Sequence, residues 1–289
     1  MQIYKTLRVY NFPKNFLIFL PIIISGEYQI INDYKKIIID LISLFLITSL
    51  IYLTNDYTDQ KIDKINKIKK NNLFLSKEQF YLHFYLILIL TLLFIYFTGV
   101  FKNYAIYLYI FNFCLYNFFF KYIKYLDILF LINFYFIRII YGSVSYDLNL
   151  SIGFIIFIYS LFFILSIYKR KIQVEINKIK EKSDIIAYTL KDISLINKSI
   201  FFALTVNLIT FIFFNINFFV KHHFLNNFFM ITDLAIFNVV IFFIVYILNF
   251  FRLFYSFLNN LIQTDIYIFF LKDKYFHISL LVLCLSLIL

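Results

Sequence analysis

Residues 80–98 read FYLHFYLILILTLLFIYFT and contain no Asp, Glu, Lys or Arg. As an α-helix this stretch would extend about 28 Å, which is close to the roughly 30 Å hydrocarbon thickness of a bilayer. Helices of soluble proteins rarely stay uncharged over such a length, because one face of them meets water. The stretch therefore predicts a transmembrane helix.

The rest of the chain has the same character. Hydrophobic residues make up 63% of the 289 residues and charged residues 15%, against roughly 45–50% and about 25% in soluble domains. With a mean hydropathy of +0.84, this composition excludes a soluble enzyme, a secreted disulfide-rich domain and a disordered chain. We predict an all-α polytopic membrane protein, one domain over residues 1–289 with nine transmembrane helices. They lie near residues 16–26, 37–54, 80–98, 103–120, 127–145, 150–168, 199–220, 228–250 and 276–289.

Basic residues fall almost entirely on one side of these predicted helices. On the side of the N-terminus lie 22 of the 27 Lys and Arg residues, four lie on the other side, and Arg138 lies within a helix. By the positive-inside rule, the N-terminus and the long loops are cytoplasmic and the C-terminus is outside. The net charge of +11 then reflects topology and attraction to anionic headgroups, and we expect no nucleic-acid partner. No small-residue cleavage site follows the first basic residues, so we expect no cleaved signal peptide.

An acidic motif at the cytoplasmic end of the second predicted helix is the main chemical signal. Asn55 is followed by Asp56, Asp59 and Asp63, and offsets of three and seven residues place the aspartates on one helical face. Carboxylates this close repel one another unless a cation lies between them, and Mg²⁺ carrying a substrate phosphate is the usual one. The alternative is a solvated helix end whose counter-ions are nearby lysines.

Basic residues follow this motif and recur near later helix ends. Lys69 and Lys70 can bind phosphate oxygens beside a metal, or can be ordinary cytoplasmic charge. Arg138 lies inside the fifth predicted helix, where a charge should face a polar cavity or a partner; it either binds a lipid phosphate or braces the helices. Lys169 and Arg170 close the sixth predicted helix and serve either phosphate binding or topology.

The pattern N-D-x-x-D-x-x-x-D closing the second of nine helices resembles the UbiA superfamily of intramembrane prenyltransferases. Further matches resemble one branch, the decaprenyl-phosphate phosphoribosyltransferases. These matches are Arg8, Lys14-Asn15, Pro21, Lys69-Lys70, Tyr116, Lys121, Asp127, Phe134, Arg138, Gly142, Lys169-Arg170 and Asp273-Lys274. The sequence departs from the branch at Asn72-Leu73, where Arg-Pro is expected, and at Gln173, where an acidic residue is expected.

The resemblance implies nine helices around a central cavity in a plasma membrane of bacterial type. It implies Mg²⁺-dependent transfer of a 5-phosphoribosyl group from phosphoribosyl diphosphate to a polyprenyl phosphate, with Asp56, Asp59 and Asp63 as catalytic metal ligands. The substrate-binding residues implied are Lys14, Asn55, Lys69, Lys70, Lys121, Arg138, Lys169 and Arg170. The last two stand where conventional prenyltransferases have a second aspartate cluster, and a cationic wall there suits two anionic substrates.

Two other functions remain open from the sequence. A conventional UbiA-type prenyltransferase would join an isoprenyl diphosphate to a small acceptor such as an aromatic acid. A non-enzymatic transporter or lipid-binding membrane protein could keep the same fold. Inverted repeats or helices broken by Gly and Pro would favour transport, and the sequence shows neither. It predicts no particular oligomeric state.

Overall fold

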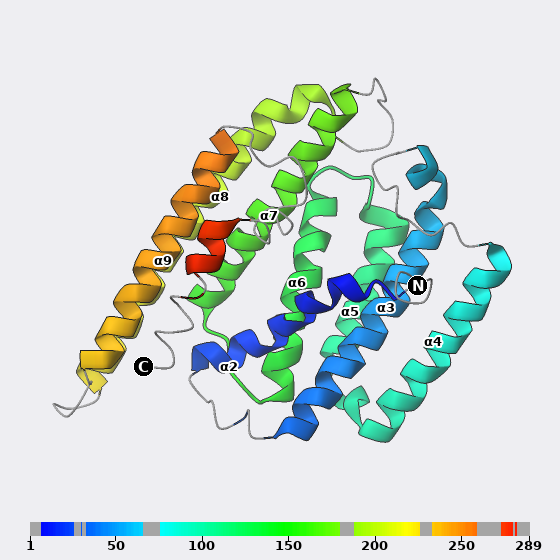
Figure 1. Cartoon of the computed structure of the whole chain (residues 1–289), viewed down its shortest axis with the longest axis horizontal. Helices are drawn as coiled ribbons and strands as arrows, with labels where there is room; N and C mark the ends of the chain where they lie inside the picture. Colours follow the sequence, from blue (N-terminus) through cyan, green and yellow to red (C-terminus); the bar gives the residue numbers. More distant parts are fainter. Residues whose placement is uncertain are drawn as a thin grey trace. The chain divides into compact units, whose positions relative to one another are not determined.

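The structure is a computed structural model that describes residues 7–25, 30, 33–65, 76–179, 188–225, 233–258, 273–279 and 281. All regular structure in this part of the chain is helical, which confirms the predicted all-α class (Figure 1). The chain divides into two compact units, Met1–Ile152 and Gly153–Leu289. Each unit has its own packing, and the single domain predicted over residues 1–289 stays a prediction.

The first unit combines long helices with short irregular ones. In chain order it contains the 3₁₀ segment η1 (Val9–Phe19), α2 (Leu20–Ser25), α3 (Tyr34–Ile65), α4 (Lys77–Thr98), the 3₁₀ turn η4 (Val100–Lys102), α5 (Ala105–Leu115), the π-helical turn η5 (Tyr116–Phe120) and α6 (Leu126–Ser145). A capping box of Ser76 and Gln79 begins α4, because each side chain accepts a hydrogen bond from a backbone N–H of the other residue. Gly99 ends α4 with a left-handed backbone (φ 71°).

The second unit contains α7 (Ile152–Ile179, beginning at the unit boundary), the 3₁₀ turn η6 (Leu190–Asp192), α8 (Ile193–Leu225), α9 (Asp233–Leu258) and a short helix at residues 274–279. Asn207 of α8 joins the three long helices. Its amide group donates to the Phe157 carbonyl and the Ser160 hydroxyl of α7, and its oxygen accepts from the Tyr246 hydroxyl of α9. Interhelical bonds of this kind stabilise helix packing in a medium without water.

An ion pair holds the short C-terminal helix to α9. Arg252 donates through two nitrogens to the two carboxylate oxygens of Asp273, with a distance of 2.7 Å from Nη2 to Oδ1. Burial would raise the pKa of Asp273, but hydrogen bonds from Arg252 and from the backbone of Tyr275 and Phe276 lower it below its usual value. The pair therefore stays charged at neutral pH.

Five helices in the described part of the chain are long and apolar enough to cross a membrane. They are Tyr34–Asp59, Lys77–Thr98, Leu126–Ser145, Ile152–Glu175 and Leu190–Phe213. Each overlaps a predicted span, and two shorter apolar helices, Ala105–Phe120 and Ile244–Ser256, overlap two more. These helices support the class of integral membrane protein. Most of the last predicted span, residues 276–289, lies outside the described residues.

The first predicted span, residues 16–26, is not one long helix. The 3₁₀ segment η1 continues to Phe19, and α2 adds only six residues. Proline explains the irregularity, because Pro13 lies inside η1 and Pro21 near the start of α2, and neither has a backbone N–H to donate. Together η1 and α2 pack against α6, and η1 also packs against α3.

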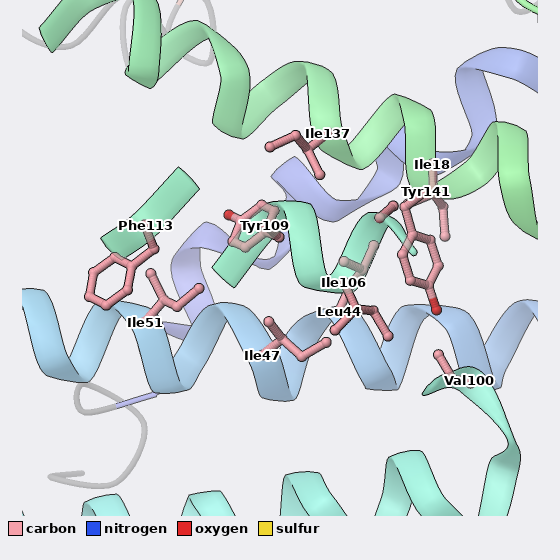
Figure 2. Packing of buried hydrophobic residues seen from close by; sticks show 11 residues of the cluster. Ile18, Leu44, Ile47, Ile51, Val100, Ile106, Tyr109, Phe113, Ile137 and Tyr141 are labelled. Atoms are coloured by element: carbon pink, nitrogen blue, oxygen red, sulfur yellow. The ribbon is translucent and has the colours of Figure 1, made fainter. Parts of the chain in front are cut away.

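A buried hydrophobic cluster joins η1, α3, η4, α5 and α6 (Figure 2). Leu44, Ile47 and Ile51 of α3 follow a spacing of three and four residues, which places them on one face of the helix. Figure 2 shows them beside Ile106 and Tyr109 of α5. The complete cluster consists of Ile18, Leu44, Ile47, Ile51, Val100, Ala105, Ile106, Tyr109, Phe113, Ile137 and Tyr141. Its packing fixes the helices that carry the polar residues described below.

Glycine is required where η1 meets α6. A Cβ atom at Gly142 would overlap the backbone carbonyl group of Ile18, so only glycine lets the two backbones approach this closely. The contact brings the polar residues of η1, Lys14 and Asn15, toward the helices of the acidic motif.

Candidate active site

Asp56 of the acidic motif is bound by Arg8. The Nε atom of Arg8 donates to Asp56 Oδ2 at 2.7 Å and its Nη2 atom donates to Oδ1, so both carboxylate oxygens are engaged. Arg8 immediately precedes η1 and has a left-handed backbone (φ 47°, ψ 46°). This conformation is uncommon for residues other than glycine and often occurs at functional positions. The N-terminal segment thus supplies a cation to the acidic motif.

Asp59, one turn further along α3, is bound by Lys121 and Asn55. The Lys121 ammonium donates to Asp59 Oδ1, and Asn55 Nδ2 donates to Oδ2 at 3.1 Å. The same ammonium lies 3.4 Å from Asn55 Oδ1, so the three side chains form a closed set. The structure therefore brings together four residues predicted from the motif and its resemblance: Asn55, Asp56, Asp59 and Lys121.

The π-helical turn η5 explains how Lys121 reaches this set. The backbone N–H of Lys121 donates a hydrogen bond to the carbonyl of Tyr116, five residues earlier, and this bond closes a wide turn. Such turns often occur at functional sites because they redirect the side chains that follow. Burial, and next the charge of Asp59, raise the pKa of the adjacent Tyr122, so the field of this carboxylate reaches beyond its own ion pair.

Asp63 lies on α3 one turn beyond Asp59, because the helix continues to Ile65. Its side chain is outside the described part of the structure. Among the described side chains, no three of His, Cys, Asp or Glu gather closely enough to form a metal cluster. The oxygens of Asn55, Asp56 and Asp59 nevertheless fit the ligand preference of a hard cation such as Mg²⁺. The neighbouring cations Arg8 and Lys121 fit the phosphate oxygens such a cation would carry.

Arg138 of α6 is a buried cation, only 2% exposed. It donates to Asn15 Oδ1 at 3.1 Å, to the Phe134 carbonyl at 2.6 Å and to the Tyr52 hydroxyl at 3.3 Å. The Tyr109 ring lies 5.1 Å from its guanidinium carbon. All these partners are neutral, and no carboxylate among the described residues pairs with Arg138. A buried positive charge without an anion is costly, so the surroundings favour an anionic ligand.

Tyr52 connects the buried arginine with the acidic motif. It lies one helical turn before Asp56 on α3, its hydroxyl accepts from Arg138, and its ring lies 5.3 Å from the Arg8 guanidinium. Lys14 of η1 is half-buried and also close enough to interact electrostatically with Tyr52. The cations Arg8, Lys14 and Arg138 thus all interact with Tyr52. Of these three, Arg8 is paired with a carboxylate, that of Asp56. The site has a surplus of positive charge that suits a phosphate group.

The remaining predicted site residues are Lys69, Lys70, Lys169 and Arg170. Lys69 and Lys70 are outside the described residues. Lys169 and Arg170 belong to the second unit, where Lys169 is exposed and Arg170 Nη1 donates to the Gln173 oxygen at 2.6 Å. One polar partner of Arg170 is therefore Gln173, which stands in place of the acidic residue expected from the resemblance.

Three residues of the site were not predicted as site residues from the sequence: Arg8, Asn15 and Tyr52. A signal for Arg8 was present, because only four arginines occur in a chain rich in lysine, and a retained Arg indicates a need for its planar group. Asn15 was one of the residues that carry the resemblance, although no binding role was predicted for it, and Tyr52 carried no comparable signal. They become part of the site only because η1, α3 and α6 pack together.

Comparison with models of known protein families finds no match to this chain, and no curated protein matches its sequence.

Proposed function

We propose that this chain is an integral-membrane transferase of the UbiA type that acts on a diphosphate donor. In this proposal it forms one domain of nine membrane-crossing segments around a central cavity, in a plasma membrane of bacterial type. The N-terminus and the long loops are cytoplasmic, and the C-terminus is outside, as the distribution of Lys and Arg requires. The donor is phosphoribosyl diphosphate and the acceptor is a polyprenyl phosphate.

One observation carries the proposal: two carboxylate–cation pairs meet at the end of one apolar helix. Asp56 with Arg8 and Asp59 with Lys121 lie one turn apart on α3. Carboxylates offer oxygens to a divalent ion, and the paired cations offer N–H groups to phosphate oxygens. A diphosphate with its metal ion needs both kinds of group together. A purely structural ion pair needs only one of each.

The reaction follows from these charges. The bond between ribose C1 and the diphosphate oxygen breaks, and diphosphate leaves with the electron pair. A lipid phosphate oxygen then bonds to C1. Mg²⁺ held by Asp56, Asp59 and Asp63 would offset the negative charge that develops on the departing diphosphate. Arg8 and Lys121 can turn from the carboxylates to the diphosphate oxygens, which stabilises the same charge. The acceptor is already an anion, so no general base is required.

The other cations have distinct roles in this proposal. Arg138 and Lys14, with the Tyr52 hydroxyl, bind a phosphate group of the donor at the inner end of the site. Lys169 and Arg170 bind the second anion, the lipid phosphate, and Lys69 and Lys70 contact the diphosphate from the cytoplasmic loop. Arg suits such sites because a guanidinium can hold two phosphate oxygens at once.

The direct test is an incubation of membranes that contain the chain with labelled phosphoribosyl diphosphate, with and without added polyprenyl phosphate. We expect label to enter the lipid fraction only when the lipid phosphate is added, with release of diphosphate. Consumption of isoprenyl diphosphate while phosphoribosyl diphosphate stays inert would replace this reaction by conventional prenyl transfer. No turnover of either donor would favour a non-enzymatic lipid-binding protein.

Arg170 distinguishes the two transferase reactions further. In the proposed reaction, Arg170→Gln raises the KM for one of the two anionic substrates roughly ten- to a hundredfold, because a charge-assisted bond contributes about 1.5–3 kcal/mol. Arg170→Lys should recover part of this loss. In conventional prenyl transfer, the same variants would change only stability or insertion.

A further inference from the structure

The chain reverses between α5 and α6 at the end of the first unit where α3 also ends (Figure 1). We call residues 118–125 the α5–α6 turn; it comprises the last residues of η5 and the residues that precede α6. Lys121, which binds Asp59 of the acidic motif, lies in the middle of this turn. The other side chains of the turn take no part in the candidate site, so their placement needs another explanation.

Most side chains of the α5–α6 turn are large, hydrophobic and exposed. Phe118 is 70% exposed, Phe119 65% and Tyr122 57%, and Ile123 and Tyr125 are exposed as well. Connections between helices usually carry small and polar residues where they meet water. A turn that exposes five large hydrophobic side chains within residues 118–125 is therefore unsuited to water.

Contacts of Phe120 and of the backbone hold the turn in place. The Phe120 ring stacks on Phe130 of α6, with ring centres 4.7 Å apart. The Ile123 N–H donates to the Phe120 carbonyl at 3.1 Å. Tyr125 has a positive φ (65°), which is costly for a residue with a large side chain and persists only where the surroundings impose it. The exposed side chains are thus presented by a fixed backbone.

The charged residues of the turn are both positive. Lys121 binds the acidic motif, Lys124 is exposed, and no Asp or Glu occurs between residues 105 and 126. A second copy of the chain that paired through the same surface would bring like charges together. Phe, Tyr and Lys side chains are instead typical of the headgroup region of a bilayer, where rings lie at the boundary with water and ammonium groups reach lipid phosphates.

The position of the turn agrees with this surrounding. It joins the apolar helix Ala105–Phe120 to Leu126–Ser145, which is long and apolar enough to cross a membrane. Only residues 121–125 lie between these two helices, so the turn stays close to the membrane surface. The exposed rings therefore lie at the depth of the lipid headgroups.

We propose that the α5–α6 turn binds the headgroup region of the bilayer, with Lys124 pairing with the phosphate of an anionic phospholipid. Phe118, Phe119 and Tyr122 insert at the boundary between headgroups and hydrocarbon. In the topology proposed above this is the cytoplasmic leaflet; the inference rests on that topology for the choice of leaflet and does not rest on the transferase reaction. Because the same turn carries Lys121, one element joins the bound lipid to the acidic motif.

The chain contains no tryptophan, so a single introduced Trp reports on its own surroundings. The test uses full-length Tyr122→Trp in vesicles of phosphatidylcholine and phosphatidylglycerol, without polyprenyl phosphate. We expect lipids brominated near the headgroup to quench its fluorescence strongly, and acrylamide in the water to quench it little. Leu90→Trp, at an exposed position in the middle of α4, should be quenched more by lipids brominated near the chain ends. Phe118→Trp is a second probe of the turn should Tyr122→Trp fail to fold.

The role of charge is tested by brominating only one of the two lipids. In Tyr122→Trp, brominated phosphatidylglycerol should quench more than the same mole fraction of brominated phosphatidylcholine. Addition of Lys124→Gln should lower the relative affinity for the anionic lipid about fivefold, the effect of one lysine near an anionic membrane surface. Lys102→Gln is the matched control, because Lys102 is an exposed lysine just before the other end of α5. It should leave the preference unchanged.

Three results would overturn the proposal. Quenching of Tyr122→Trp by acrylamide and not by brominated lipid would place the turn in water. Protection from both quenchers would show that protein covers the turn. Equal quenching by the two brominated lipids would show that Lys124 selects no anionic lipid. None of these measurements requires transferase activity, so their outcome is independent of the proposed reaction.

Discussion

Arg8 and Asp56, 48 residues apart in the chain, form a two-point ion pair that ties the segment before η1 to the end of α3. The pair occupies both oxygens of a carboxylate that we propose as a metal ligand. Lys121 and Asn55 occupy the oxygens of Asp59 in the same way. In the absence of substrate, the site therefore neutralises its own carboxylates, and a metal ion must compete with these cations for them.

Removal of the Arg8 side-chain charge should separate metal binding from turnover. In Arg8→Gln, Asp56 is free, so Mn²⁺ should bind the substrate-free protein more tightly. Turnover should fall roughly ten- to a hundredfold, because the diphosphate loses a cation worth about 1.5–3 kcal/mol. Titration with Mn²⁺ measured by electron paramagnetic resonance checks the first effect. Arg252→Gln breaks a similar pair with Asp273 and should change neither quantity; an unchanged Mn²⁺ affinity in Arg8→Gln would contradict the competition.

The aspartates themselves should be indispensable. Asp56→Asn and Asp59→Asn should each abolish turnover while the protein stays folded and inserted, because one lost ligand leaves the diphosphate charge poorly offset. Asp63→Asn should be tolerated better, since Asp63 lies a turn further along α3. Asp33→Asn, at the exposed start of α3, is the control. Turnover that survives EDTA or Asp59→Asn would refute a metal–diphosphate mechanism.

Arg138 either binds a phosphate or braces the helices, and one variant separates these roles. Arg138→Lys keeps the charge but cannot maintain three hydrogen bonds in the directions of Asn15, Phe134 and Tyr52. We expect the KM for phosphoribosyl diphosphate to rise about tenfold or more with a small change in thermal midpoint. A large fall in the midpoint with an unchanged KM would show that Arg138 only braces the bundle.

Two glycines provide a matched test of packing. Gly142→Ala places a Cβ against the Ile18 carbonyl, so η1 must shift and the free energy of unfolding should fall by about 1–3 kcal/mol. Gly153→Ala meets no atom within 4 Å and lies in α7, so it should be neutral or stabilise the helix by up to about 1 kcal/mol. Thermal unfolding of the purified variants measures both. Equal effects of the two substitutions would contradict the close approach of η1 and α6.

The proposed topology is open to direct labelling. Tags within residues 60–78 and 170–195, between the predicted spans, should be protected in intact cells, and a tag after Leu289 should be accessible to added reagent. The expected asymmetry follows from 22 basic residues on one side and four on the other. Tags that all lie on the same side would refute an odd number of membrane crossings.

The membrane class and the positions of the long helices could be predicted from sequence alone. A run such as residues 80–98 carries this information locally, because an uncharged segment of that length has no stable place in water. The acidic motif could also be predicted locally. Offsets of three and seven residues place Asp56, Asp59 and Asp63 on one face of a helix before any tertiary contact forms. The first predicted span is divided between η1 and α2, and this too has a local basis, because Pro21 lies within it.

Only the tertiary structure decided the partners of these residues. Arg8 reaches Asp56 across 48 positions, Lys121 reaches Asp59 across 62, and Arg138 reaches Asn15 across 123. No periodicity encodes such pairs, because they depend on the close approach that Gly142 permits and on the π-helical turn that directs Lys121. The same holds for Asp40 of α3, whose carboxylate accepts a hydrogen bond from Tyr141 of α6 across 101 positions. Apolar length determines what crosses a membrane, whereas packing determines which polar groups meet inside it.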